Sequence, residues 1–336
     1  MKRPQLKTIL PFLLWMVVSL AAMGQQKPQY NQYVINNYLL NPAIAGIEEY
    51  VDVRIGARQQ FTGVDGAPST QYVSAHMPLG YTSYGHNDRN VQQAPSFSSL
   101  RNNPMIKPKP HHGIGLMVVH DEIGAFSRTE ASFAYAYHLL LSKEIKLAAG
   151  ASAGIIQESV SASKLEFFDP ADPTDVDWNA VKPNLNMGLW LYSSNFYVGV
   201  SGAQLFANDV HFDDTIDDRN HQSRHYFVTG AYKFELTDRL SLIPSVMAMW
   251  VQPLPGSIDF NLRGVYDNRF WVGGSYRENG SFAALAGVNL SSTFDVGYSY
   301  DTGMSGQNGV NSGSHEVVVG IRLLNKRKVF CPSNLW

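Results

Sequence analysis

The chain has 336 residues, 44% of them hydrophobic, and its 26 Lys and Arg against 28 Asp and Glu give a net charge of −2. This slightly acidic balance argues against a nucleic-acid partner. The single cysteine, Cys331, excludes an internal disulfide. The length permits either one large β domain or two smaller soluble domains.

Residues 1–24 have the features of a signal peptide. Basic residues come first, an apolar stretch covers 9–20, and small residues at 21–24 offer a cleavage site. The apolar stretch is shorter than the roughly 20 residues that a membrane-spanning helix needs. We therefore expect cleavage and export.

Residues 25–49 lack a strand pattern and carry turn chemistry instead. Pro42 restricts Asn41 to extended conformations, and Gly46 can supply a positive φ. We expect an irregular segment that precedes the first strand.

From residue 50 to 323 the sequence alternates apolar and polar residues with a period of two. In one run, Phe133, Tyr135 and Tyr137 alternate with smaller or polar residues. Fourteen stretches of this kind can be counted, and no further long apolar run occurs. The pattern is typical of a transmembrane antiparallel β-barrel of about 14 strands, an all-β fold in contact with outer-membrane lipids.

The polar side of this alternation carries charges of both signs. A wet barrel lumen accommodates them, whereas a dry core would not. We interpret them either as a structural ion-pair lattice between neighbouring strands or as an electrostatic lining for cargo or ions. The residues are Arg54, Arg58, Asp259, Arg263, Arg277, Asp295, Asp301, Glu316 and Arg322.

The connections between strands favour a barrel over a soluble two-layer sheet with a solvated polar face. From the fourth strand onward, short turns alternate with longer connections, the first long one being 158–183. Outer-membrane barrels have short periplasmic turns and longer outer loops, which predicts periplasmic termini. The connection at 79–110 breaks this rule. Counting the strands from the N-terminus puts it at the periplasmic end of the barrel, yet it is long. It is either a disordered insertion or a periplasmic contact segment.

In a barrel, the segment 25–49 is expected to be periplasmic and to lie beneath or inside the strands. Its aromatic and amide side chains are then candidates for a plug or for a partner surface. The residues singled out are Tyr30, Gln32, Tyr33, Asn36, Asn41, Pro42, Ala43 and Gly46.

Residues 324–336 follow the last strand as a basic and then apolar tail. We expect it to be periplasmic, where it could dock on machinery or simply extend the last strand. The candidate docking residues are Lys326, Arg327, Lys328, Phe330 and Trp336.

Residues that could carry chemistry give weak signals, and we expect neither an enzyme nor a resident cofactor. Two loops rich in aspartate, within 169–177 and 213–218, could bind calcium but lack EF-hand spacing. Histidines show no metal-ligand spacing. Ser314 and His315 are adjacent, but no nucleophile-elbow pattern is present.

The N-terminal motifs resemble those of the PorP/SprF family of the type IX secretion system of Bacteroidetes, and further matches follow in order along the barrel. The motifs are Gln29-Tyr30-Asn31-Gln32-Tyr33, Asn36, Leu40-Asn41-Pro42-Ala43-Ile44-Ala45-Gly46, Arg58-Gln59, Gly66-Ala67-Pro68, Ser74-x-His76-x-Pro78, Asn195-Phe196-Tyr197-Val198-Gly199, Arg224-His225-Tyr226, Asn268-Arg269-Phe270-Trp271, Gly297-Tyr298-Ser299-Tyr300-Asp301 and Gly313-Ser314-His315-Glu316.

The resemblance implies a non-enzymatic outer-membrane component of type IX secretion or gliding. Such a component binds secreted surface cargo, including adhesins, and cooperates with periplasmic ring and motor components. The long 79–110 connection departs from many relatives. It leaves open whether this member serves the general machinery or one cargo. A general diffusion porin is the alternative, and an outer-membrane hydrolase is the third reading.

Overall fold

The computed structural model describes residues 32–80, 110–142, 144–164, 178–206, 209–210, 220–221, 223–251, 254–278, 280–302, 313–325 and 335. In these ranges no helix is long and apolar enough to cross a membrane. Several predicted features lie outside the described residues. They are the signal peptide, Tyr30, residues 81–109, both aspartate-rich loops, Lys326, Arg327, Lys328, Phe330 and Trp336.

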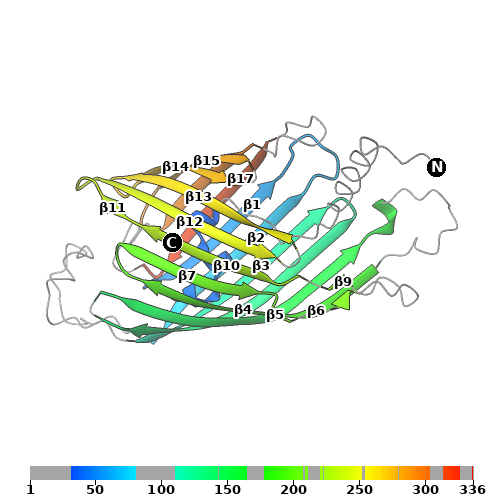
Figure 1. Cartoon of the computed structure of the whole chain (residues 1–336), viewed down its shortest axis with the longest axis horizontal. Coiled ribbons are helices and arrows are strands. Elements are labelled where there is room, and N and C mark those ends of the chain that lie inside the picture. The colour runs from blue at the N-terminus through cyan, green and yellow to red at the C-terminus, as the bar shows by residue number, and fades with distance from the viewer. Residues whose placement is uncertain are drawn as a thin grey trace, which may run out of the picture.

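Fourteen strand positions form a closed antiparallel barrel (Figure 1). The ring closes at two points, where β1 pairs with β17 and where β10 pairs with β12. β11 continues the position of β10, since both pair with β12. The barrel predicted from the alternation is therefore confirmed, with its strand number. The strands are β1 (Val51–Gln59), β2 (Ser69–Leu79), β3 (His111–Ile123), β4 (Phe126–Leu140), β5 (Lys146–Val160), β6 (Trp178–Tyr192), β7 (Phe196–Ala203), β10 (His225–Tyr232), β11 (Phe234–Glu235), β12 (Leu240–Val251), β13 (Leu254–Tyr266), β14 (Phe270–Arg277), β15 (Ser281–Asn289), β16 (Phe294–Asp301) and β17 (Ser314–Leu323).

Short elements complete the described structure. Two two-residue strands, β8 (Asp209–Val210) and β9 (Asn220–His221), pair with each other apart from the ring. The 3-10 helices are η1 (Gln32–Val34), η2 (Asn37–Leu39), η3 (Pro42–Ile44) and η4 (Ala162–Lys164).

Side chains alternate between the outer face and the lumen as the period of two requires. On β4, Phe133 and Tyr135 are about half exposed on the outer face, at 50% and 47%, while Ala134 and Ala136 are buried on the inner side. On β1, Asp52, Arg54 and Arg58 are turned inward and buried. An apolar outer face around a polar interior suits a barrel surrounded by lipid.

The predicted connection at 158–183 is too long. β5 continues to Val160 and β6 begins at Trp178, so the connection covers 161–177. The polar residues in these strand ends were read as a loop, but Lys182 Nζ lies 2.6 Å from Glu158 Oε2 on the neighbouring strand. An ion pair between neighbouring strands stabilises charged side chains at positions where the sequence alone favours a loop.

The two ends of the barrel differ. At one end, here called the short-turn end, β4–β5, β6–β7, β13–β14 and β15–β16 are joined by a few residues each. At the other end, the long-connection end, lie the links 161–177 and 302–313. The link between Leu79 and His111 belongs to the short-turn end, since it starts and ends there.

Candidate functional site

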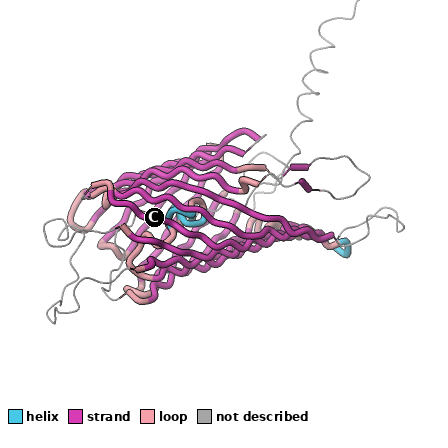
Figure 2. Tube along the Cα trace, turned by 90° about the horizontal axis from the view of Figure 1, so that it is seen from below, coloured by secondary structure: helices cyan, strands magenta, loops and turns pink. Residues whose placement is uncertain are grey.

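The N-terminal segment 32–50 lies inside the barrel, between its walls (Figure 2). Residues 33–48 are all buried, although none of them belongs to a strand. The tight turns of η1, η2 and η3 fold the segment on itself between the walls of the barrel. We call residues 32–50 the lumenal segment.

The turn at η3 forms for the reasons read from the sequence. Asn41 is extended, with φ −141° and ψ 113°, and its side-chain oxygen accepts a hydrogen bond from Ala43 N at 2.9 Å. Pro42 starts the turn, where its missing N–H costs nothing. Gly46 ends it with φ +74°. The extended Asn41 and the positive φ of Gly46 are thus confirmed.

Three inward-facing glycines make room for this turn. A Cβ at Gly113 on β3 would lie 1.9 Å from Ala45 O, and one at Gly188 on β6 would lie 2.1 Å from Asn41 Oδ1. A Cβ at Gly150 on β5 would lie 2.5 Å from Ala43 Cα. We call these three positions the glycine seat. They let the backbone of η3 approach the backbone of the wall more closely than any larger residue would allow.

Polar side chains fasten the lumenal segment to the same wall and its neighbours. Asn41 Nδ2 donates to Leu189 O on β6 at 3.0 Å and to Val200 O on β7 at 3.1 Å. Ser201 Oγ donates to Leu40 O at 2.7 Å. Each such bond contributes on the order of 1 kcal/mol, and more is lost when a buried partner is left unsatisfied.

The opposite wall is reached through Tyr33. Asn261 Nδ2 on β13 donates to Tyr33 Oη at 2.8 Å, and Tyr33 Oη lies 3.5 Å from Asp259 Oδ2. Burial, reinforced by the charge of Asp259, raises the pKa of Tyr33 well above its ordinary value. The phenol therefore keeps its proton and donates to the carboxylate. Contacts on two facing walls fix the segment across the lumen.

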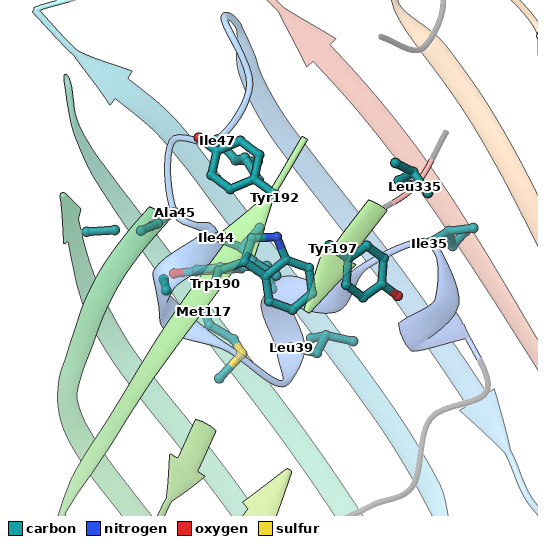
Figure 3. Packing of buried hydrophobic residues seen from close by; sticks show 14 of the residues in the cluster. Ile35, Leu39, Ile44, Ala45, Ile47, Met117, Trp190, Tyr192, Tyr197 and Leu335 are labelled. Carbon is teal, nitrogen blue, oxygen red and sulfur yellow. The ribbon is translucent and has the colours of Figure 1, made fainter. Parts of the chain in front are cut away.

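Apolar packing fills the space between these polar contacts (Figure 3). Trp190 on β6 is completely buried and stacks on Tyr197 of β7, with ring centroids 4.5 Å apart. Ile35, Leu39 and Ile44 of the lumenal segment belong to the same cluster.

Leu335, near the end of the chain, also belongs to this cluster. Its exposed fraction is 1%, and Figure 3 shows it among the residues of the cluster, as it does Ile35. Leu335 thus buries its side chain against apolar residues of the lumenal segment. The predicted docking of the tail concerns residues outside the described ones and stays a prediction.

The charged residues predicted for the lumen come together in three groups. Arg58 contacts Asp301 and Glu316 at 2.5 and 3.3 Å. Arg277 forms a two-point contact with Asp259 at 2.8 and 2.9 Å. Asp295 lies between Arg54 and Arg322, at 3.3 and 2.6 Å, and Arg54 also contacts Asp52 at 3.2 Å.

Arg263 contacts an aromatic ring of the lumen. Its guanidinium carbon lies 5.9 Å from the centre of the Trp271 ring, a cation–π contact.

The remaining motif residues are placed as follows. Asn36 is buried and donates through Nδ2 to Ser74 Oγ of β2 at 3.1 Å. Ala43 is fully buried. Gln32 begins η1, and its side chain is outside what the structure describes.

The adjacent Ser314 and His315 point to opposite faces of β17. Ser314 is buried in the lumen, whereas His315 faces outward and bonds Tyr298 at 2.7 Å, so the two cannot form a nucleophile–base pair. Among the described ranges, no three His, Cys, Asp or Glu side chains are grouped to hold a metal ion.

Sequence reasoning missed the glycine seat and three lumenal histidines. His76, His111 and His138 face the turn at Ala45 and Gly46 from β2, β3 and β4. The available signal was the alternation along each strand, in which every second side chain faces the lumen. This alternation separates the inward-facing His111 from the outward-facing His112.

Several solved structures resemble the barrel at low identity. Omp33 of Acinetobacter baumannii has a TM-score of 0.46 and 9% identity, covering 83% of this chain and 100% of that one. The monoaromatic hydrocarbon channel CymD has a TM-score of 0.49 and 10% identity, covering 89% and 94%. A mutant porin of Rh. blastica has a TM-score of 0.34 and 7% identity, covering 82% and 99%. These values say nothing of function.

A comparison with curated proteins finds no match. A family model does match, over residues 22–321, and its description is type IX secretion system membrane protein PorP/SprF. This range includes the lumenal segment and nearly all of the barrel. The chain therefore belongs to the PorP/SprF family and is a structural β-barrel protein of the outer membrane in type IX secretion, not an enzyme.

Proposed function

We propose that this protein is a sealed barrel that anchors secretion partners in the outer membrane and does not conduct solutes. In this proposal the strands hold the protein in the lipid. The short-turn end contacts periplasmic ring and motor components, and the long-connection end contacts secreted surface cargo such as an adhesin. Family membership supports a role within the secretion machinery.

The observation that carries the proposal is the buried lumenal segment. It is held on one wall by the glycine seat and Asn41, and on the other by Tyr33. A diffusion porin needs a continuous aqueous path. A segment fixed to facing walls by hydrogen bonds and apolar packing opposes such a path, which favours the anchor over the porin.

The orientation of the partners follows from the turns. In outer-membrane barrels the short turns face the periplasm. Under this rule the proposal puts the short-turn end in the periplasm, and with it Leu79 and His111, which flank the long 79–110 connection. The connection and the basic stretch that follows Leu323 are our candidates for contact with ring components. The links 161–177 and 302–313 are our candidates for contact with cargo.

Removal of residues 25–46, with the signal peptide retained, is expected to open the lumen. Single-channel recordings in planar bilayers should show little conductance for the mature chain and a large, steady conductance for the deletion. Equal conductance of the two proteins would overturn the seal and favour the porin.

Crosslinking and mass spectrometry in the native envelope test the partners. With an amine-reactive reagent, we expect ring or motor peptides on Lys107 and Lys109 of the 79–110 connection. Lys164 in η4, at the long-connection end, is the matched control and should give secreted surface proteins instead. Crosslinks confined to lipids and other barrels would contradict the anchor.

A further inference from the structure

Three histidines enclose the last turn of the lumenal segment. Gly46 N donates to His76 Nδ1 of β2 at 3.3 Å. His111 Nε2 of β3 lies 2.9 Å from Gly46 O, and His138 Nε2 of β4 lies 2.8 Å from Ala45 O. Two consecutive residues are therefore held by imidazoles from three neighbouring strands, directly beside the glycine seat.

One set of protonation states satisfies all of these contacts. His76 must present a bare Nδ1 to accept from Gly46, while His111 and His138 donate their Nε2 protons to the two carbonyl oxygens. His138 Nδ1 lies 2.9 Å from Tyr192 Oη and accepts from that hydroxyl. The turn is thus closed when His76 and His138 are neutral, and a neutral His111 completes the set.

Additional protons would act against this arrangement. A proton on His76 Nδ1 would place two N–H donors face to face. The rings of His111 and His138 are parallel, with centroids 4.4 Å apart, so charging both would bring two cations into contact. Like charges at that distance repel strongly in a site with little water.

The other charged groups around the three rings are unevenly placed. His76 faces Asp52 and Arg54 of β1, which act on its charge in opposite directions, and its ring also contacts Tyr38 of η2. His138 faces the cation of Lys146 on β5, which opposes a further positive charge.

The lumenal segment contributes two acids nearby. Glu48 and Glu49 act on the charge of Lys146, the cation that faces His138.

We propose that His76, His111 and His138 form an acid-released latch that holds the lumenal segment in the barrel. At neutral pH the imidazoles bind the turn at Ala45 and Gly46, and the lumen is sealed. In acid, protonation removes the acceptor of Gly46 and sets the stacked pair in repulsion, so the turn leaves the glycine seat. This latch rests on the proposed sealing of the lumen by the same segment.

The test is the conductance of the reconstituted mature chain at constant salt, between about pH 8 and about pH 5, a range that spans the ordinary titration of histidine. We expect low conductance at the higher pH and a several-fold reversible rise at the lower one. Hydrogen exchange of peptides covering 33–46, corrected for the intrinsic effect of pH and compared with peptides of β4, provides a second readout. It should show loss of protection only in acid.

Non-titrating substitutions separate the latch from other effects of acid. The triple variant His76→Asn, His111→Gln and His138→Gln offers amides to the same backbone atoms and is expected to stay closed at both pH values. The matched control is His112→Gln, because His112 neighbours His111 but faces outward and bonds Tyr135. It should respond to pH like the unmodified chain.

The outcomes distinguish this inference from the function on which it rests. If the chain lacking 25–46 conducts at both pH values while the full chain stays closed at about pH 5, the seal stands and the latch is wrong. A triple variant that opens in acid like the unmodified chain would also overturn the latch. If the deletion conducts no more than the full chain, the lumenal segment does not seal the lumen, and both the proposed seal and the latch that rests on it are wrong. Should the triple variant fail to assemble, hydrogen exchange of the unmodified chain still decides.

Discussion

Replacement of Gly150 by leucine is expected to force the lumenal segment out of its seat and to raise the conductance toward that of the chain lacking 25–46. A Cβ at this position would already lie 2.5 Å from Ala43 Cα and 2.7 Å from Pro42 O. Both are backbone atoms, which cannot rotate away as a side chain would. Overpacking a tight site costs about 1–3 kcal/mol even when neighbours relax.

The cost falls on the segment rather than on the barrel. Gly150 pairs with Gly188 on β6 and with Ala136 on β4, and these strands are held by long hydrogen-bonded ladders. The lumenal segment has only scattered hydrogen bonds and apolar contacts, so it moves first. Planar bilayer recordings and limited proteolysis at 33–46 measure the displacement.

Gly264→Leu is the matched control. Gly264 also lies within a strand, but the nearest atom to its added Cβ is 4.0 Å away, and it faces outward on β13. This variant should remain closed and resistant to protease. A closed Gly150→Leu variant with a protected segment would show that the seat does not hold the turn.

The barrel was predictable because its signal is local. Each strand carries its own alternation, as Phe133 and Tyr135 show on β4, and the two sides of the wall differ in polarity throughout. The ends of β5 and β6 were not predictable, because Glu158 and Lys182 resemble loop residues until the register between the two strands brings them together.

The seat and the latch were hidden for a related reason. Gly113, Gly150 and Gly188 are ordinary strand glycines in the sequence, and only the register of β3 to β6 aligns them in one row under a single turn. Likewise, His111 and His112 are adjacent in the sequence and look equivalent there. Because side chains alternate along β3, His111 faces the lumen and His112 faces outward. The alternation along a strand identifies which glycines and histidines face the lumen. It does not reveal what they contact, because their common partner is the lumenal segment, which precedes all the strands.

The charged lumenal residues illustrate the same limit. Their inward parity could be read from the sequence, but their partners depend on the closing pair of strands. Arg58 lies opposite Glu316 only because β1 pairs with β17 in the observed register, and Asp301 completes the group from β16. Closure of the ring therefore creates the contacts that stabilise its own junction.

Removal of Arg58 is expected to produce the second large effect. The side chains of Arg58, Asp301 and Glu316 are 5%, 7% and 0% exposed, so Arg58→Ala leaves two carboxylates close together with little water. Breaking a buried ion pair by removing one partner costs about 3–5 kcal/mol, because the buried charge that remains loses compensation. We expect the free energy of unfolding, measured by denaturant titration in lipid vesicles, to fall by that amount.

The control is an ion pair that lacks burial. Lys164 contacts Glu122 through side chains that are 54% and 41% exposed, so Lys164→Ala should change the free energy of unfolding by no more than about 1 kcal/mol. A second comparison is between Arg58→Ala alone and Arg58→Ala combined with Glu316→Gln. The difference in their free energies of unfolding measures the effect of the Glu316 charge. Because that double variant carries one buried acid fewer, it should recover part of the stability lost in Arg58→Ala. If Arg58→Ala is no more destabilising than Lys164→Ala, water reaches these groups freely, and the junction of β1 and β17 depends on its backbone ladder rather than on its charges.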